Sequence, residues 1–565
     1  MLFINPANER FGGILSRYIP VGIPVALGVL SAYLRKWGVK NIRVLDEEIE
    51  KITPENIRQK LEGLDRPLVV GITVLTSQAG RAYEIARMIK DIEPDSIVIL
   101  GNVHVTTLPS EPLEMGVADI VVRGEGEETL RELYFALREG KDWKNIKGIS
   151  YLNESNTVIS NPDNDLIENL DDVPIFPYEL FEHPRYDMGF LTGARGCPYK
   201  CTYCSQRLLT GFTYRWHSTK RIIKNLDVLI NKYNQKSITF YDDIFSVNKK
   251  RVLDLCDGII ASGLHKKCSF AVQTRADNVY EDILPAMKKA NFKTIGLGME
   301  TGVERIAAEA QKGQTVQQHL EAIERCKKYG FKVSLFMIYG FPGETKKDRE
   351  ETYAITQKVN VGYIKFNNLI PYPGTPLYET AKKSGTLHIT PGWLNCNSTL
   401  SITRSIFSTT PLPYVPEGTT EFELKRDIIK HNLKAYFQWK VVKKILMRDK
   451  GVGWIALPPQ WYLKPKEFGM LFGMTVVLGT NLLFSFLPCR IGDFVFSLIR
   501  RGNPIKPPKD IKVTERSFSR SKAPEIDPQH LRADVQEERL ANESVERDEV
   551  EGRAPWLKWS TINQE

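Results

Sequence analysis

The chain has 565 residues, of which 42% are hydrophobic and 26% charged, and its formal net charge is +9. This composition is typical of a globular protein and excludes collagen-like and wholly disordered chains. A charge of +9 over this length is mild. It does not by itself indicate nucleic-acid binding, which needs basic residues clustered on one surface.

Eight cysteines occur, three of them within eight consecutive residues and five scattered. A disulfide framework would be denser and in a shorter, secreted chain. The N-terminal run Met1–Pro6 is apolar and lacks the basic region and cleavage site of a signal peptide. We therefore expect a reducing, cytoplasmic setting.

Residues 1–135 alternate short β-branched runs with amphipathic stretches such as 25–37 and 78–92. This alternation predicts an α/β domain, a doubly wound parallel sheet with helices on both faces. Ligands of such sheets bind at the carboxyl ends of the strands. The expected strands are 2–5, 41–46, 68–75, 96–101 and 118–122.

Residues 136–185, punctuated by Asn, Asp and Pro, are expected to form a connecting region. A second alternation then runs through residues 186–385. Six β/α units fit a partial (β/α)6 barrel, whose chemistry lies at the C-terminal strand ends. The expected strands are 190–193, 237–241, 269–273, 294–298, 332–338 and 363–369.

Residues 386–501 are expected to be mainly helical, with one helical stretch over 421–447, and residues 502–565 to form a disordered tail. Phe468–Cys489 carries no charged residue over 22 positions. Three interpretations stay open for this apolar segment: a buried helical pair over the barrel mouth, a monotopic membrane anchor, or a membrane span. The basic run 500–522 is either a solvated tail or attracts anionic lipids, which would make 468–522 a membrane surface.

The most specific motif is Cys197-x3-Cys201-x2-Cys204, which follows the first expected barrel strand. Three thiolates on one tight loop can hold three irons of a four-iron cluster and leave the fourth iron open to a substrate. Zinc is the alternative, but it normally takes four closed ligands or three plus water. No second Cys or Cys/His pair lies nearby in the sequence to complete such a set.

This spacing, with an aromatic residue before the third cysteine, resembles that of the radical S-adenosylmethionine (SAM) enzymes. The resemblance implies a 4Fe-4S cluster held by Cys197, Cys201 and Cys204, with Tyr203 against the adenine of SAM. It also implies that SAM binds the open iron and is cleaved after one electron arrives from a donor such as ferredoxin or flavodoxin.

Polar and Gly/Pro segments end the later barrel strands. One follows each strand in turn, and together they resemble the strand ends of the radical SAM enzymes. They are 241–243, 273–275, 298–302, 340–344 and 371–376. We expect contacts to SAM or substrate, with a structural role as the alternative for each, from Asp242, Gln273, Arg275, Gly298 and Glu300.

The N-terminal domain has no G-x-G-x-x-G after its first strand and no Walker sequence. The residues alone leave flavin, a nucleotide, cobalamin or a regulatory fold open. The order of 22–34, 73–77, 101–104 and 122–127, however, resembles the cobalamin-binding domain fused to many radical SAM enzymes. That resemblance implies cofactor contacts from Thr73, Ser77, Gly101, Asn102, His104, Gly124 and Glu125.

Two features of this domain qualify the resemblance. His104 could instead be an ordinary hydrogen-bonded loop histidine. Proteins that ligate cobalt from below carry Asp-x-His-x-x-Gly after the second strand, whereas this chain reads Asp46-Glu47-Glu48-Ile49-Glu50-Lys51. We therefore expect a lower cobalamin face without histidine.

Together these features predict an enzyme that uses a 4Fe-4S cluster, SAM and cobalamin to modify an unactivated carbon of a small apolar metabolite. Methyl transfer is the main hypothesis for its reaction. One alternative is radical cyclisation or rearrangement of a tetrapyrrole or isoprenoid lipid. Another is a non-catalytic, membrane-associated metal-binding scaffold. A nucleic-acid partner is disfavoured because the basic tail lacks interleaved aromatics apart from Phe518. The expected location is the cytoplasm, free or on the cytoplasmic face of a membrane.

Overall fold

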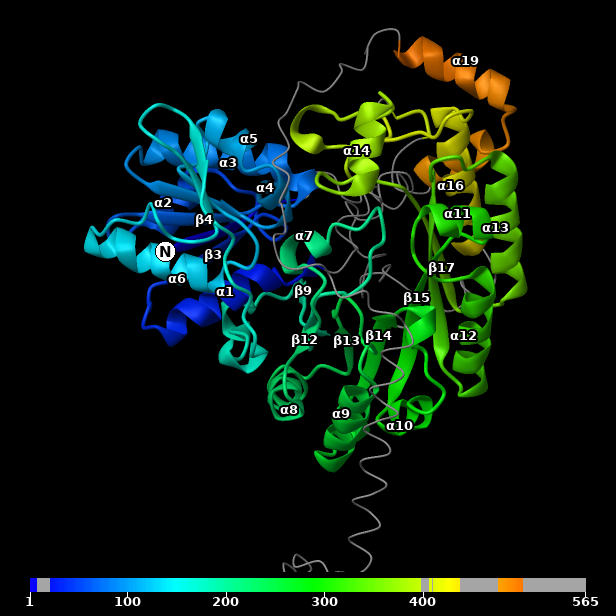
Figure 1. The fold of residues 1–565 in the computed structure, drawn as a ribbon, viewed down its shortest axis with the longest axis horizontal. Coiled ribbons are helices and arrows are strands. Elements are labelled where there is room, and N and C mark those ends of the chain that lie inside the picture. Colours follow the sequence, from blue (N-terminus) through cyan, green and yellow to red (C-terminus); the bar gives the residue numbers. More distant parts are fainter. Residues whose placement is uncertain (8–20, 398–405, 409, 437–475, 501–565) are drawn as a thin grey trace, which may run out of the picture. The chain divides into compact units, whose positions relative to one another are not determined.

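The computed structural model describes residues 1–7, 21–397, 406–408, 410–436 and 476–500. The N-terminal part folds around a seven-stranded sheet in the order β3-β1-β4-β5-β6-β7-β8 (Figure 1). Its first five strands in this order pair in parallel, as the β-branched runs predicted. These strands are β1 (Leu2–Asn5), β3 (Arg43–Asp46), β4 (Val69–Thr73), β5 (Ile97–Gly101) and β6 (Ile120–Val122).

Helices pack on both faces of this sheet, so the doubly wound prediction is confirmed. One face carries Phe3, Val69 and Ile99 against Leu27 of α1 and Leu133 of α6. The other face packs on α2, α3, α4 and α5. The helices are α1 (Val25–Lys36), α2 (Pro54–Leu61), α3 (Ala79–Ile92), α4 (Val103–Thr107), α5 (Ser110–Glu114) and α6 (Glu127–Glu139).

The sheet continues beyond residue 135, which the sequence analysis took as its end. Strands β7 (Ile149–Leu152) and β8 (Val158–Ser160) extend it in antiparallel fashion from β6. Part of the expected connecting region, residues 149–160, therefore belongs to the N-terminal sheet. An antiparallel edge strand on a mostly parallel sheet is common, and a short hairpin needs no helical crossover.

A second, six-stranded parallel sheet follows in the order β10-β13-β14-β15-β16-β17, which confirms the six expected barrel strands. The strands are β10 (Phe190–Leu191), β13 (Ser237–Phe240), β14 (Ser269–Thr274), β15 (Phe292–Glu300), β16 (Lys332–Tyr339) and β17 (Tyr363–Asn368). The connecting helices include α8 (Thr219–Asp227), α9 (Lys249–Ala261), α10 (Leu284–Lys289), α11 (Glu304–Glu309), α12 (Val316–Lys328) and α13 (Lys346–Lys358).

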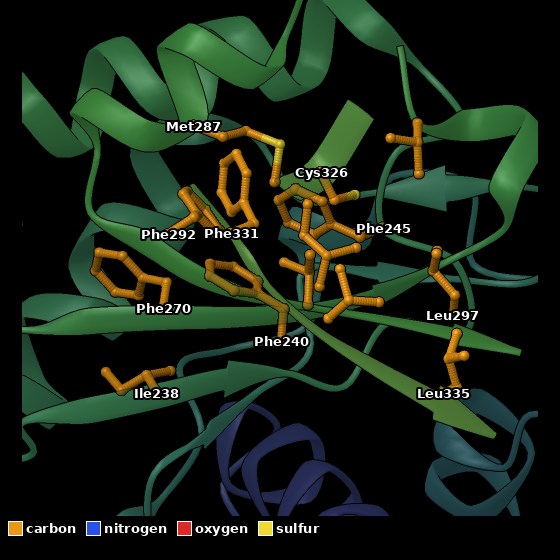
Figure 2. Packing of buried hydrophobic residues seen from close by; sticks show 14 of the residues in the cluster. Ile238, Phe240, Phe245, Phe270, Met287, Phe292, Leu297, Cys326, Phe331 and Leu335 are labelled. Atoms are coloured by element: carbon orange, nitrogen blue, oxygen red, sulfur yellow. The ribbon is translucent and has the colours of Figure 1, made fainter. Parts of the chain in front are cut away.

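The core of this half lies between the strands and the helices on one face of the sheet (Figure 2). Phe240, Phe270 and Phe292 come from three adjacent strands, and their ring centroids lie 5.2 to 6.1 Å apart. Aromatic pairs at such distances add to the free energy of burial.

Helix α16 (Glu421–Tyr436) closes the edge of the second sheet. Asn432 accepts from the Phe366 N–H (3.0 Å) and donates to the Phe366 carbonyl (2.8 Å), so it satisfies the edge of β17. On the same helix, Asp427 binds the fully buried Arg349 of α13 at 2.8 Å. The edge strand is thus covered by a helix that side chains fix in place.

Only part of the expected C-terminal features falls within the described residues. Helix 476–484 and α19 (Cys489–Arg500) are described, whereas residues 437–475, which include the start of the apolar segment, and the expected tail 502–565 lie outside. Within the described part of the chain, no helix has both the length and the hydropathy needed to cross a bilayer.

The turn after β16 gives a prediction about pH. Burial raises the pKa of Glu344 to about 8. Because this value lies above the usual 4.5, the folded protein holds the proton more tightly than the unfolded chain does. The protonated carboxyl therefore contributes to the free energy of unfolding. This contribution is complete below pH 4.5 and declines towards pH 8, by about 1.4 kcal/mol per pH unit.

We expect wild type to lose stability relative to Glu344→Gln between pH 5 and 8, with no further divergence at higher pH. Denaturant unfolding of both proteins across this range measures the difference. A difference that stays constant with pH would contradict the assignment.

Candidate functional site

The three cysteines lie on the loop after β11 (Ala194–Arg195), which pairs with β12 (Arg215–Trp216). Burial raises the pKa of the Cys197 thiol to about 12 and that of Cys204 to about 11. Thiols in this setting become thiolates by binding a metal, which deprotonates them. The Arg275 guanidinium, with Nη1 3.9 Å from Cys201 Sγ, places a positive charge beside the loop.

The donor set of the cysteine loop suits an iron–sulfur cluster. Its three free cysteine thiols are the usual ligand type of such clusters, in which each thiolate binds a separate iron. Among the described residues, no three His, Cys, Asp or Glu side chains converge on one metal position.

The strand ends beside the loop form a charged, largely buried surface. Arg275 stacks on the Tyr199 ring at 3.6 Å and donates to Asp277 Oδ2 at 3.0 Å and to the Lys312 carbonyl at 2.7 Å. Lys312 Nζ donates to Glu300 Oε1 at 2.7 Å and also to the Gly298 carbonyl.

Tyr203 and Gln273 complete the predicted group. Burial, with Glu300 nearby, raises the pKa of Tyr203 well above its usual range, so this phenol stays neutral. The Tyr203 ring lies 5.7 Å from that of Phe341, in an edge-to-face contact. The Gln273 side chain is exposed at the end of β14. The structure thus gathers Tyr203, Arg275, Gly298 and Glu300 near the cysteines.

Asp242 instead has internal partners. One of its oxygens accepts from the N–H groups of Gly193 (2.6 Å) and Ala194 (3.0 Å), and the other binds Arg251 at 2.7 Å. The side chain is fully buried. These contacts fix the start of the cysteine loop. They support the structural role that we gave as the alternative for Asp242.

A cavity of about 340 Å³ lies between the N-terminal sheet and the cysteine loop. One wall is apolar and includes Val25, Val29 and Leu30 of α1. The predicted residues Thr73, Gly101, Asn102, Gly124 and Glu125 line the cavity, and Ser77 does not. The opposite wall comes from the second half of the chain and includes Arg195, Gln206, Leu209, Tyr241 and Asp243.

Glycines make room in this cavity. A Cβ added at Gly101 would meet only the Val122 carbonyl, at 3.6 Å, so a longer side chain there would extend into the cavity. Gly124 has φ +74, a conformation that few other residues adopt. Close backbone approach and an apolar wall suit a large, nearly flat ring, so the residues present fit cobalamin.

Glu125 lies on the cavity wall but is held by arginines. It binds Arg215 Nη2 at 2.6 Å and Arg195 Nη1 at 3.5 Å, while Glu127 binds Arg195 at 2.7 Å. We call these four side chains the interdomain ion cluster. Its arginines hold the pKa of Glu125 below the usual value although burial opposes this.

His104, expected either to contact the cofactor or to be hydrogen-bonded within the fold, has internal partners. Its side chain is 0% exposed and is absent from the cavity wall. His104 Nε2 lies 2.9 Å from Glu111 Oε2, and Glu111 also accepts from Trp393 Nε1 (3.0 Å) and Tyr83 Oη (3.1 Å). The alternative, a buried hydrogen-bonded histidine, describes this residue.

The loop after β3 is occupied by structural contacts. Asp46 accepts from Tyr186 Oη at 2.7 Å and Asn5 Nδ2 at 2.8 Å. Glu47 binds Arg81 at 2.6 Å. The loop in which we expected no cobalt-ligating histidine thus begins with two carboxylates, Asp46 and Glu47, that are engaged within the fold.

The sequence analysis missed several residues of the site. Lys312 and Gln314 follow α11 rather than a strand end, and Arg195 and Arg215 flank the cysteine motif. Asp243 was noted only as part of a strand end. It accepts from the Gly196 N–H and from Gln206 Nε2, both at 2.8 Å, and burial raises its pKa to about 6.

Comparison with known proteins agrees with both halves of the site. The model of the Radical SAM superfamily matches residues 191–355, and that of the B12 binding domain matches residues 14–134. The chain is 34% identical over 434 residues to "Uncharacterized methyltransferase PH0819" of Pyrococcus horikoshii, covering 76% of this chain and 90% of that protein. It is 26% identical over 391 residues to the anaerobic magnesium-protoporphyrin IX monomethyl ester cyclase of Rubrivivax gelatinosus (67% and 69%).

Solved structures agree in fold. TsrM from Kitasatospora setae, a radical SAM methyltransferase with cobalamin and a [4Fe-4S] cluster bound, matches with a TM-score of 0.59 at 16% identity, over 89% of this chain and 99% of that one. The cobalamin-dependent radical SAM enzyme OxsB matches with a TM-score of 0.60 at 18% identity, over 89% and 75%.

The fold and site thus define an enzyme with two cofactor-binding halves. The chain belongs to the radical SAM superfamily, among the members that carry a B12-binding domain. Its cofactors are a 4Fe-4S cluster, SAM and cobalamin. Enzymes of this family use SAM and a reductant.

The cysteine loop gives the first prediction about the site. Cys201→Ala removes one of the three expected cluster ligands, so we expect iron to fall from about four per chain to near zero, with loss of the visible chromophore. Cys256→Ala, at a buried cysteine in the barrel core, is the matched control and should keep both. Full iron content in Cys201→Ala would contradict the assignment.

The cavity gives the second prediction. Gly101→Leu projects a side chain into the cavity, so we expect cobalt per chain to fall at least about tenfold while iron is unchanged. Gly101→Ala, whose Cβ has room, should lose far less. Metal analysis after reconstitution with cobalamin measures both, and unchanged cobalt in Gly101→Leu would refute the cavity as the cofactor site.

Proposed function

We propose that the enzyme transfers a methyl group from SAM, by way of cobalamin, to an unactivated carbon of a small apolar metabolite. The observation that carries the proposal is the cavity, whose walls come from the N-terminal sheet on one side and from the cysteine loop and its neighbours on the other. This arrangement allows two cofactors to serve one substrate. The relative with 34% identity, named a methyltransferase, supports the same choice.

The chain's own residues would hold SAM beside the cysteine loop. Lys312 and Glu300 present one cation and one carboxylate, the complement of the carboxylate and ammonium of an amino acid. Tyr203 offers a neutral aromatic ring to the adenine. Arg275 offsets negative charge at the thiolates, which its distance from Cys201 allows.

The cavity residues would hold cobalamin and keep water away from it. Gly101 and Gly124 permit close approach of the backbone, while Val25, Val29 and Leu30 supply an apolar wall. When bound, the cluster with SAM supplies a carbon radical that removes hydrogen, and cobalamin supplies methyl transfer. The loop after β3 reads Asp46-Glu47-Glu48-Ile49-Glu50-Lys51 and has no histidine, so this loop would supply no histidine ligand to cobalamin.

Cyclisation or rearrangement without methyl transfer is the second candidate. It is supported by 26% identity to the magnesium-protoporphyrin ester cyclase, and both reactions begin with the same removal of hydrogen. A tetrapyrrole or isoprenoid lipid would fit this candidate. In either case we propose a one-electron donor such as ferredoxin or flavodoxin, and a reaction in the cytoplasm or at its membrane face.

Isotope-labelled SAM distinguishes the two candidates. The reconstituted enzyme is incubated with a reductant, SAM carrying a trideuteromethyl group and an apolar extract of the source cells. Methyl transfer predicts a deuterated product together with S-adenosylhomocysteine and 5′-deoxyadenosine in similar amounts. The second candidate predicts 5′-deoxyadenosine alone and an unlabelled product, a result that would refute methyl transfer. Cys201→Ala should form none of these, and Cys256→Ala should match wild type.

A further inference from the structure

Residues 476–499, which comprise helix 476–484 and most of α19, carry an unusual amount of exposed apolar surface. Of the exposed large hydrophobic side chains in the described part of the chain, more than half fall in this segment. They are Val476, Leu482, Leu483, Phe486, Ile491, Phe494, Leu498 and Ile499. We call them the apolar face. Exposed large apolar side chains gathered in one segment indicate a site of interaction.

The polarity of this segment is inverted relative to a helix in water. Asn481 and Ser485 are 1% and 2% exposed and face the protein, where Asn481 Oδ1 accepts from the Ile406 N–H at 2.8 Å. Leu483 and Phe486, between and beside them, are 68% and 66% exposed. A water-facing helix shows the opposite pattern. Apolar residues on the outside match an apolar surrounding medium.

The segment is nevertheless firmly seated. Phe496 of α19 packs with Ile406, Phe422, Ile429 and Leu433 in a small core of its own. The inside of the segment is therefore occupied by α16, and only its outer side lacks a partner among the described residues.

A basic pocket of about 380 Å³ adjoins the apolar face. Its walls are α13, α16 and residues 485–488, and Phe486 belongs to both the pocket and the apolar face. Four basic side chains and two acidic ones line it: Lys346, Arg426, Lys430, Lys434, Glu350 and Asp427. Burial lowers the pKa of His431, which also lines the pocket, to about 3, so the positive charge comes from the lysines and the arginine.

Helix α16 supplies lysine side chains to this pocket that could bind an anion. Arg426, Lys430 and Lys434 recur every four residues, a spacing at which like charges repel one another. Arg426 binds Asp427 at 3.0 Å. Among the residues that the structure describes, Lys430 and Lys434 form no ion pair, although Lys434 lies 5.5 Å from the centre of the Tyr353 ring. Such a stripe is suited to an anionic partner.

We propose that the apolar face and the basic pocket dock the enzyme on a bilayer that contains anionic phospholipids, with a lipid phosphate in the pocket and the apolar side chains at the acyl boundary. The sequence supports this occupant, because eight basic residues against Asp510 and Glu515 follow over positions 500–522. That basic run repels a basic pocket and is therefore a poor occupant for it. The proposal does not depend on the reaction proposed above.

Vesicle flotation of the full-length protein tests the proposal. The vesicles contain either phosphatidylcholine alone or equal parts of phosphatidylcholine and phosphatidylglycerol. We expect wild type to bind the anionic vesicles and to prefer them strongly. Leu483→Glu/Phe486→Glu should weaken binding at least about tenfold, because two apolar side chains no longer enter the bilayer. Lys430→Gln/Lys434→Gln should weaken binding to anionic vesicles by about fivefold per lysine and leave the weak binding to phosphatidylcholine unchanged.

Two matched controls change equivalent residues elsewhere. Met115→Glu places a charge on an exposed apolar residue of the N-terminal domain, and Lys220→Gln/Lys224→Gln removes two exposed lysines one turn apart on α8. Both should bind like wild type, and visible absorption checks that each variant folds. Three results would overturn the proposal: no flotation of wild type, equal binding by the first double variant, or a wild-type dimer in light scattering that Phe486→Glu abolishes. If Lys430→Gln/Lys434→Gln bound anionic vesicles as well as wild type, this result would contradict the proposed binding of a lipid phosphate in the basic pocket.

Discussion

Arg195 lies between the two halves of the chain, two residues before the first cluster cysteine, and pairs with Glu127 at 2.7 Å and with Glu125 at 3.5 Å. Arg215, on the strand paired with that of Arg195, binds Glu125 from the same side. All four side chains are largely buried. Removing one partner from a buried pair typically destabilises by about 3–5 kcal/mol, because the other charge stays behind. The position of the cysteine loop relative to the N-terminal sheet therefore depends on this interdomain ion cluster.

The topology of the two sheets explains why that contact matters for chemistry. The strands that end at the cavity are parallel in both sheets, and ligands gather at the carboxyl ends of such strands. The cavity is lined by Thr73 and Gly101, which end β4 and β5, and by Leu191 and Tyr241, at the ends of β10 and β13. A single apolar core that joins Leu100 and Val105 to Phe341 and Trp393 fixes the halves on their other side. Two strand-end sites thus border one space.

Local sequence patterns predicted most of the strands and helices because β-branched runs and amphipathic stretches carry their signals within a few residues. The tight Cys motif is equally local, and the cluster ligands that it implies stay a prediction. Whether an individual polar residue takes a structural or a functional role depends on partners that are far away in the chain. His104 is engaged by Glu111, which Trp393 also binds across 282 residues, and Asp242 by Arg251 and the loop at Gly193. Lys312 had no strand-end signal, and the hairpin β7–β8 was concealed by polar residues such as Ser150 and Ser160, which bond each other at 2.8 Å.

The central claim is that one chain binds an iron–sulfur cluster and cobalamin at adjoining sites. Anaerobic reconstitution with iron, sulfide and cobalamin, followed by visible absorption and metal analysis of the purified protein, tests it most directly. The account predicts about four irons and about one cobalt per chain. Iron without cobalt would contradict the assignment of the N-terminal cavity, and zinc in place of both metals would contradict the account as a whole.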